Sequence, residues 1–315
     1  MNTDQILPRL DGMPFIKKFL SLLFIIAICF LITLLVGSLL AIPFFGLDAI
    51  MNLTQTDLFS NTNGIHLLKF FQAINQIGVF VLPAFIFGYL ANRKPLAYLQ
   101  LDRKFTLLML TFSLVLIIVS IPFINLLVEF NEQIKLPDFL NNIENWMRHA
   151  EDQAKLITDA FLKVDTITGL MINLIIIAFL ASLGEELLFR GVILKLFIQL
   201  FRNIHLAVIL SALLFSALHL QFYGFLPRML LGIFFGYIFI WSGSLWIPIV
   251  LHFVFNGISV VAAYLYETGV IQTDAYALGA NQHPIVIISS VILSTALIYL
   301  LFQIRKRKPL TPIQQ

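Results

Sequence analysis

The chain has 315 residues, of which 59% are hydrophobic and 12% are charged, and its formal net charge is +3. Soluble domains average roughly 45–50% apolar and about 25% charged residues, so this composition excludes a soluble globular protein and a disordered one. The single cysteine excludes a disulfide scaffold and a CxxC-type metal site, and the small net charge without a basic stripe argues against nucleic-acid binding.

Long apolar runs are the first structural signal along the chain. They cover residues 19–45, 70–91, 106–128, 168–189, 204–222, 229–242, 245–266 and 284–304. A helix needs roughly 17–25 apolar residues to cross the hydrocarbon core of a bilayer, and a helix satisfies its own backbone there. The run 229–242 is short, and we expect its helix to begin near Phe225. The sequence therefore predicts an all-α polytopic membrane protein with about eight transmembrane helices.

The first run is much longer than the roughly 7–15 apolar residues of a cleaved signal peptide. We therefore expect it to be retained as a transmembrane helix. No internal repeat and no low-complexity linker divides the chain, so we expect a single integral membrane domain over residues 1–315.

Most of the 20 Lys and Arg residues flank the runs on one side of the predicted membrane. These are Arg9, Lys17, Lys18, Arg93, Lys94, Arg103, Lys104, Arg190, Lys195, Arg202, Arg305, Lys306, Arg307 and Lys308. Cytoplasmic flanks carry the excess of basic residues, so we expect a multi-pass protein of the cell membrane with both termini in the cytoplasm. Lys69 and Arg228 fall on the opposite side, and a long basic side chain can reach the interface from a helix end.

Residues 131–167 form a long connection with a different pattern. Apolar residues recur there every three or four positions: Leu140, Ile143, Met147, Ala150, Ala154, Ile157, Phe161 and Val164. This spacing predicts an amphipathic, extramembrane helix. Two placements are open: the helix lies on the outer membrane surface, or it caps the neighbouring loops.

Charged residues inside the apolar runs are rare, and two adjacent ones stand out. Glu185 and Glu186 lie in the fourth run, and Arg190 follows closely. A charge at the bilayer centre costs roughly 2.5–3.5 kcal/mol on insertion scales, so two neighbouring carboxylates need a reason. Glu186 and Arg190 share a helix face and can pair, whereas Glu185 points about 100° away. The alternative is an ion pair that locks two helices, for which one glutamate would be sufficient.

Two further polar motifs lie in later runs. Phe215 to His219 reads FSALH in the fifth run, and His252 to Asn256 reads HFVFN in the seventh. His252 and Asn256 share a helix face. A lone histidine in a membrane helix is often only a partner in an interhelical hydrogen bond. Two histidines, an asparagine and two glutamates in otherwise apolar helices indicate a site instead.

The spacing also predicts that Glu185 and His219 lie at similar depth. A turn at Arg202-Asn203 would join the fourth and fifth helices as an antiparallel hairpin, with the fourth continuing to about Phe201. Glu185 and His219 are nearly equidistant from that turn, at about 25 Å for a rise of about 1.5 Å per residue.

This set of side chains suits the hydrolysis of an amide. A carboxylate in a site of low dielectric constant can take a proton from water and return it to the leaving group, and a nearby histidine can orient the water. An asparagine amide and a second histidine can donate hydrogen bonds to the oxyanion. Ser216 lies beside the second motif, but nothing marks it as an activated nucleophile.

Zinc is an alternative occupant of the same residues, because zinc accepts histidine and carboxylate ligands. The sequence has no HExxH motif, however, and two adjacent glutamates do not easily face one ion. We therefore predict no metal and no other cofactor.

The three motifs together resemble those of a known family. Glu185 to Arg190 is similar to EExxxR, Phe215 to His219 to FxxxH, and His252 to Asn256 to HxxxN. These motifs, in this order on apolar helices, resemble the CPBP (Abi) intramembrane proteases. That family includes the type II CAAX prenyl endopeptidases and bacteriocin-processing or self-immunity proteins.

The resemblance covers about residues 168–260 and implies a glutamate-dependent endopeptidase with an eight-helix core. It implies that Glu185 and His219 activate water, and that His252 and Asn256 stabilise the oxyanion. The supporting residues would be Glu186, Arg190 and Phe215. The implied partners are a membrane-bound peptide or protein substrate and the lipid bilayer, with no nucleic acid; a prenylated substrate is not carried over.

Two other classes of protein are open. One is a non-catalytic membrane module for immunity or scaffolding, in which the polar cluster is a structural lock. The other is a transporter that relays protons through the carboxylates. The sequence shows no inverted repeat and no paired broken helices for a transporter.

Overall fold

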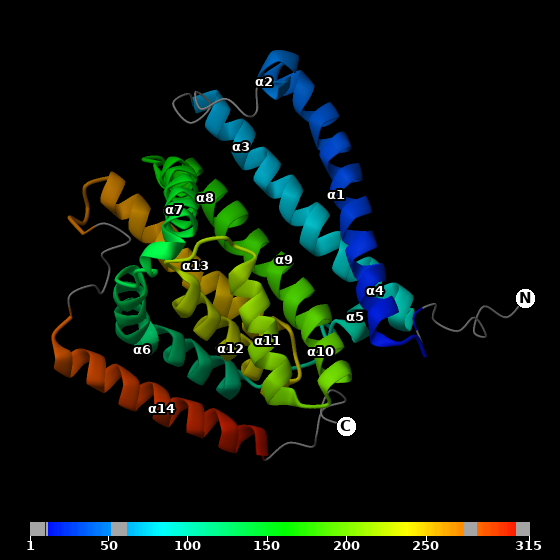
Figure 1. Ribbon diagram of the computed structural model, residues 1–315, viewed down its shortest axis with the longest axis vertical. Helices are drawn as coiled ribbons and strands as arrows, with labels where there is room; N and C mark the ends of the chain where they lie inside the picture. Colours follow the sequence, from blue (N-terminus) through cyan, green and yellow to red (C-terminus); the bar gives the residue numbers. More distant parts are fainter. Residues whose placement is uncertain (1–9, 11, 52–61, 274–281, 307–315) are drawn as a thin grey trace, which may run out of the picture.

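The computed structural model describes residues 10, 12–51, 62–273 and 282–306, and every regular element within them is helical (Figure 1). The α-helices are α1 (Phe15–Phe45), α2 (Leu47–Met51), α3 (Thr62–Asn75), α4 (Leu82–Asn92), α5 (Pro95–Tyr98), α6 (Leu107–Glu132), α7 (Asn141–Leu162), α8 (Ile167–Asn173), α9 (Ala181–Leu188), α10 (Leu194–Phe201), α11 (Ile204–Ala217), α12 (Phe225–Ser242), α13 (Trp246–Glu267) and α14 (Pro284–Lys306). Three π-helical segments, η3 (Gln76–Val81), η5 (Leu174–Leu180) and η6 (Phe189–Ile193), and one 3₁₀ turn, η4 (Asp138–Leu140), complete the set. The prediction of an all-α polytopic membrane protein is confirmed.

Seven helical stretches in the described residues are long and apolar enough to cross a membrane. They are Phe15–Phe45, Thr62–Asn92, Leu107–Glu132, Ile167–Phe201, Phe225–Ser242, Trp246–Glu267 and Pro284–Lys306. The remaining predicted run contains α11, which has 14 residues. At about 1.5 Å per residue α11 rises about 21 Å, less than the roughly 30 Å of a bilayer core.

The early end of α11 differs from the prediction of a helix over 204–222. The chain leaves the helix after Ala217, and Leu220 then adopts a left-handed backbone with φ of 54°. The Ser216 hydroxyl donates to the backbone oxygen of Phe225 at 2.7 Å and closes the loop 218–224. Apolar residues continue through this stretch, so hydropathy alone carries no signal that the helix stops. The expected start of the next helix at Phe225 is present.

Residues 167–201 form one continuous helical rod, in which α8, α9 and α10 are separated by η5 and η6. The expected extension to Phe201 is therefore present. The turn that follows is also as expected: Arg202 has a φ of 49°, and the Asn203 side chain accepts a hydrogen bond from the Leu206 amide at 3.1 Å, which caps α11.

The core of the molecule surrounds the second half of this rod. Buried side chains of α9, η6 and α10 pack with α4, α11 and α12 in one cluster that includes Phe87, Leu187 and Phe239. A second cluster joins α6, α12, α13 and α14. Small residues allow the close approach of α11 and α12, because a Cβ at Gly232 would lie 2.9 Å from the Cβ of Ala212. The rod that carries the two glutamates is thus held on several sides.

The amphipathic segment forms α7, which packs on the loop 218–224. The Tyr223 amide donates to Oε2 of Glu151 at 3.1 Å, and the rings of Trp146 and Phe222 lie 5.2 Å apart. The guanidinium of Arg148 lies 4.9 Å from the Tyr223 ring. These contacts are those of a cap on a neighbouring loop, one of the two placements left open by the sequence.

Arg148 is oriented by its neighbour on α7. It donates two hydrogen bonds to Oε1 of Glu144, at 2.6 and 3.1 Å. These bonds and the Leu136 amide hold the pKa of the Glu144 carboxyl below its usual range. A lowered pKa means that the charged pair persists at neutral pH and is lost only as the pH falls through that value.

The helix ends that carry the predicted cytoplasmic residues gather at one end of the bundle (Figure 1). The start of α1, the α4–α5 connection, the start of α6 and the ends of α10 and α14 all lie there, opposite the end that holds α7. Arg9, Arg307 and Lys308 lie outside the described residues. The cytoplasmic placement of this end stays a prediction.

Candidate active site

Helix α9 places two acidic side chains in the interior of the bundle. Glu186 is fully buried, and Glu185 is 9% exposed. The π-helical segments η5 and η6 adjoin α9 at its two ends, and such segments are frequent at functional sites. Gly184 lets η3 approach this helix closely, because a Cβ there would lie 2.9 Å from the Cβ of Phe80 and 3.2 Å from Oε1 of Gln76.

Glu186 is the centre of a buried polar network. Its Oε1 accepts hydrogen bonds from Nη1 of Arg190 at 2.6 Å and from Nδ1 of His252 at 2.9 Å. Arg190 also donates through Nη2 to the backbone oxygen of Gly232 at 3.1 Å. Buried charges are tolerated when they are paired in this way. The network ties α9 and η6 to α12 and α13.

Glu185 lies beside this network and takes no part in its hydrogen bonds. Its Oε2 is 3.8 Å from Nε2 of His252, which is too long for a direct hydrogen bond. It makes no hydrogen bond to any residue that the structure describes. Because the carboxylate of Glu186 can only accept, Nδ1 of His252 carries the proton in that contact, and Nε2 is the ring atom nearest Glu185.

Phe215 lies between the network and His219. Its ring centre is 4.8 Å from the Arg190 guanidinium, 6.1 Å from the His252 ring and 4.9 Å from the His219 ring. Both histidine contacts are edge-to-face, and a cation within about 6 Å of an aromatic face is attracted to it. The phenylalanine of the second motif therefore works as a spacer between the buried ion pair and the first histidine.

His219 lies just beyond α11, at the start of the loop 218–224, and is half-buried. Its Nδ1 is 2.8 Å from the backbone oxygen of Phe215. A carbonyl oxygen only accepts, so the proton is on Nδ1, and Nε2 is left as an acceptor. The left-handed conformation of Leu220 beside it costs about 1–2 kcal/mol, and such strain clusters at functional sites. No hydrogen bond or ion pair joins His219 to Glu185 within the described part of the chain.

Asn256 lies one turn after His252 on α13. Its Nδ2 is 3.5 Å from the backbone oxygen of Ile177 in η5, a long and weak contact. Among the described residues it makes no hydrogen bond to either glutamate or to either histidine. The structure therefore gathers the other residues of the three motifs and leaves this amide turned toward the backbone of η5.

Two neighbours of the cluster were not predicted as site residues. The ring of Phe235 stacks on His252 with centres 5.2 Å apart and lies 5.5 Å from the Arg190 guanidinium. Phe235 is one of several aromatic residues in an apolar helix, so nothing in the sequence distinguished it as a site residue. Arg228 interacts electrostatically with Glu185 and donates to the backbone and side-chain oxygens of Gln221 at 3.2 and 2.7 Å. Its presence on the less basic side was the available signal.

The described residues contain no group of three or more His, Cys, Asp or Glu side chains arranged to hold a metal ion. The oxygen of Glu186 nearest His252 already accepts two hydrogen bonds. Chelation of metal ions tests the zinc alternative.

An apolar groove of about 600 Å³ runs along the helix that carries His252 and Asn256. Its lining includes Leu174 of η5 together with Phe253 and Gly257 of α13. A Cβ at Gly257 would meet its nearest atom, in the side chain of Leu174, at 3.8 Å, so there is room for a small side chain at this point of the groove. The groove offers an apolar surface next to the polar cluster.

The fold and the cluster define a class: polytopic helical membrane proteins with a buried glutamate–arginine–histidine site. Residues 167–258 match the family model described as type II CAAX prenyl endopeptidase Rce1-like. This match confirms the resemblance to the CPBP/CAAX protease family, and the matched segment contains all residues of the three motifs. No curated protein and no solved structure matches the chain.

Proposed function

We propose that this protein is an intramembrane endopeptidase that hydrolyses a peptide bond of a membrane-associated protein or peptide. The observation that carries the proposal is that the two adjacent glutamates differ in their hydrogen bonds. Oε1 of Glu186 accepts hydrogen bonds from both Arg190 and His252, whereas Glu185 lies 3.8 Å from the same histidine and makes no hydrogen bond to the described residues. A structural lock explains the first glutamate and leaves the second without a role.

In the proposed reaction Glu185 is the general base, and Nε2 of His219 helps to orient the water. The water oxygen attacks the carbonyl carbon while its proton passes to the carboxylate. The protonated Glu185 then gives that proton to the leaving amine as the C–N bond breaks. General acid–base steps of this kind contribute about 10²–10⁴-fold to a rate.

The oxyanion would be stabilised by His252 and Asn256. For His252 to donate through Nε2, both ring nitrogens must carry protons, and Glu186 at Nδ1 supplies the counter-charge for that state. Asn256 must turn from the carbonyl of Ile177, and its 3.5 Å contact there is weak enough to exchange for a shorter one. Arg190 and Phe215 hold these groups in place.

The substrate class follows from the setting of the site. The apolar groove along α13 supports a substrate that approaches from the membrane. We place the protein in the cell membrane with both termini in the cytoplasm, on the strength of the basic helix ends. We propose that residues 1–315 form one integral membrane domain, with a protease core at 168–260 and an extramembrane segment at 131–167.

The His219→Asn variant tests this function directly. An asparagine amide can replace Nδ1 in the bond to the Phe215 carbonyl but provides no base at the position of Nε2. We expect cleavage of membrane-anchored peptides in proteoliposomes, followed by mass spectrometry of the products, to slow by about 10²-fold with the melting temperature retained.

The matched control is His205→Asn at the start of α11, the helix that ends just before His219. His205 bonds to the Tyr237 hydroxyl at 2.6 Å, and within the described part of the chain it forms no hydrogen bond or ion pair with the cluster. It should cleave at the wild-type rate. Equal rates for the two variants and the wild type would exclude His219 from the reaction.

Chelation separates the proposal from its zinc-dependent version. Because the proposed base is a carboxylate and Oε1 of Glu186 already accepts two hydrogen bonds, activity should survive EDTA and dialysis against metal-free buffer. The measurement is the rate of peptide cleavage before treatment, after treatment and after adding Zn²⁺. A loss that Zn²⁺ restores would support the zinc mechanism instead.

The second candidate is a non-catalytic immunity or scaffold module. The observation that favours it is the network of Glu186, Arg190, His252 and Gly232, which joins α9, η6, α12 and α13 as a lock would. It predicts that substitutions in the cluster lower thermal stability while no membrane peptide is cleaved by the wild type.

A further inference from the structure

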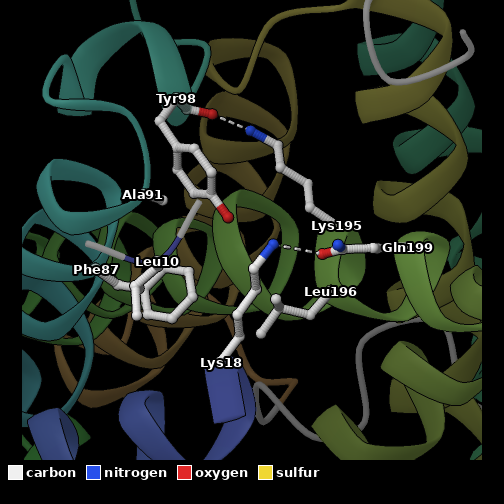
Figure 2. Close-up of a pocket in the computed structure, with 8 residues that line it drawn as sticks. All are labelled: Leu10, Lys18, Phe87, Ala91, Tyr98, Lys195, Leu196 and Gln199. Atoms are coloured by element: carbon white, nitrogen blue, oxygen red, sulfur yellow. Dashed lines mark hydrogen bonds between the residues drawn. The ribbon is translucent and has the colours of Figure 1, made fainter. Parts of the chain in front are cut away.

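A separate cavity lies away from the glutamate cluster, at the basic end of the bundle. It has a volume of about 190 Å³ and is enclosed by the start of α1, the α4–α5 region and α10 (Figure 2). Leu10 and Phe87 line its apolar side, and the polar lining comes from Lys18, Tyr98 and Lys195 together with Gln199. Neither the three sequence motifs nor the proposed reaction uses these residues.

Donor groups converge inside this cavity. The ammonium of Lys18 donates to Oε1 of Gln199 at 3.1 Å, and the hydroxyl of Tyr98 points toward the same ammonium (Figure 2). Lys195 donates to the backbone oxygen of Tyr98, and its ammonium lies 4.7 Å from the Tyr98 ring and 5.5 Å from the Phe239 ring.

Among the described residues, no carboxylate pairs directly with either ammonium group at the cavity. Lys18 and Lys195 contact only neutral oxygens and aromatic rings, and neither forms an ion pair within the described residues. None of the described residues that line the cavity is an Asp or a Glu. Asp102 interacts with Lys195 only at longer range. Because partly buried charges are normally paired, two such ammonium groups around one cavity indicate an anionic ligand.

The position of the cavity in the membrane indicates the kind of anion. Lys17 and Lys18 directly precede the apolar run 19–45, so this part of α1 lies where hydrocarbon gives way to headgroups. Apolar side chains on the opposite face of the same part of α1 are highly exposed, with Ile16 at 57% and Leu20 at 56%, so this stretch of the helix faces lipid. A ligand with a phosphate head and acyl chains suits a cavity at this depth, because the head can enter the cavity while the chains stay in the surrounding lipid.

We propose that this cavity binds the phosphate group of an anionic phospholipid headgroup. Lys18 and the Tyr98 hydroxyl donate to the phosphate oxygens, Gln199 completes the set through its amide, and Lys195 adds the second positive charge. Basic pockets between transmembrane helices on the cytoplasmic side bind headgroups by this chemistry, and hydrogen bonds between an ammonium and a phosphate are among the stronger ones. The exposed apolar surface of α1 favours a lipid over free phosphate.

The test uses the purified full chain in detergent and native mass spectrometry. Three probes are titrated: short-chain phosphatidylglycerol, a diacylglycerol with the same chains, and inorganic phosphate. We expect phosphatidylglycerol to bind, the diacylglycerol to bind much more weakly, and inorganic phosphate to compete only at far higher concentration. Competition by inorganic phosphate at concentrations similar to those of phosphatidylglycerol would overturn the lipid in favour of a free anion, and equal binding of diacylglycerol would overturn the phosphate site altogether.

Variants locate the binding. Lys18→Gln should weaken phosphatidylglycerol binding about fivefold, since one basic residue near a lipid surface contributes about that much. Lys18→Arg should keep most of the affinity, and Lys17→Gln, which removes the same charge from the exposed neighbouring position, should leave it unchanged. Tyr98→Phe removes one hydroxyl with little risk to folding and should weaken binding by itself.

The comparison of the Lys17 and Lys18 variants shows whether the lipid binds at a defined site. Equal losses for Lys17→Gln and Lys18→Gln would show a diffuse basic surface in place of a site, and undiminished binding by both Lys18→Gln and Tyr98→Phe would place the lipid elsewhere. Peptide cleavage by these variants is measured separately, so that failure of the lipid site is distinguishable from failure of the proposed peptidase.

Discussion

Glu185→Gln should lower the rate of peptide cleavage by about 10²–10⁴-fold without lowering the melting temperature. The substitution keeps the shape of the side chain and removes only its ability to take a proton. Glu185 makes no hydrogen bond to the described residues and lies 3.8 Å from Nε2 of His252, so no structural bond is broken. The measurement is single-turnover cleavage of a membrane-anchored peptide, with thermal unfolding in detergent recorded on the same samples.

The control is Glu267→Gln, which removes an exposed carboxylate at the end of the helix that carries His252. It should cleave at the wild-type rate. Comparing the Glu185→Gln and Glu267→Gln variants distinguishes the two main interpretations of the cluster, a structural lock and a catalytic site. A structural lock predicts a lower melting temperature for Glu185→Gln, and a general base predicts a lost reaction in a stable protein. Full activity in Glu185→Gln would exclude this residue as the base.

Local helix geometry was enough to predict part of the site. The Glu186–Arg190 pair is four residues apart on one helix, and the structure places it at 2.6 Å. The turn at Arg202-Asn203 could also be predicted from the sequence, because asparagine is a strong capping residue at the start of a helix. Both features depend on residues that are close in the sequence, so helical periodicity and residue propensities are sufficient to predict them.

The contacts between distant residues could not be predicted in the same way. His252 bonds to Glu186, which lies 66 positions away in the sequence. The spacing of residues along one helix does not show which other helix packs against it. Phe235 stacks on His252 from an apolar helix in which its aromatic ring is unexceptional. The motif resemblance pointed to the residues of the site, but the direct contact of Glu186 with the histidine came only from packing.

The end of α11 shows a different limit of sequence reasoning. Apolar residues continue past Ala217, so hydropathy predicted one helix to residue 222. The chain instead turns at Leu220, and contacts from Ser216, Glu151 and Asn131 hold the loop. The consequence for function is that His219 lies on a loop held by α7 and α6 and not on a rigid helix. The predicted similar depth of Glu185 and His219 assumed that the fifth helix continues to residue 222, whereas α11 ends at Ala217.

Removing one partner of the buried Glu186–Arg190 pair should destabilise the protein by about 3–5 kcal/mol, because the remaining charge is left without compensation in the interior. Arg190→Met leaves Glu186 with only His252, and Glu186→Leu leaves Arg190 with only the carbonyl of Gly232. The double variant removes both charges, and we expect it to unfold at a higher denaturant concentration than either single variant. Equilibrium unfolding in mixed micelles gives the three values for a double-mutant cycle. Additive losses would show that the two side chains do not depend on one another, and would remove the ion pair as the reason why α9 tolerates a second carboxylate.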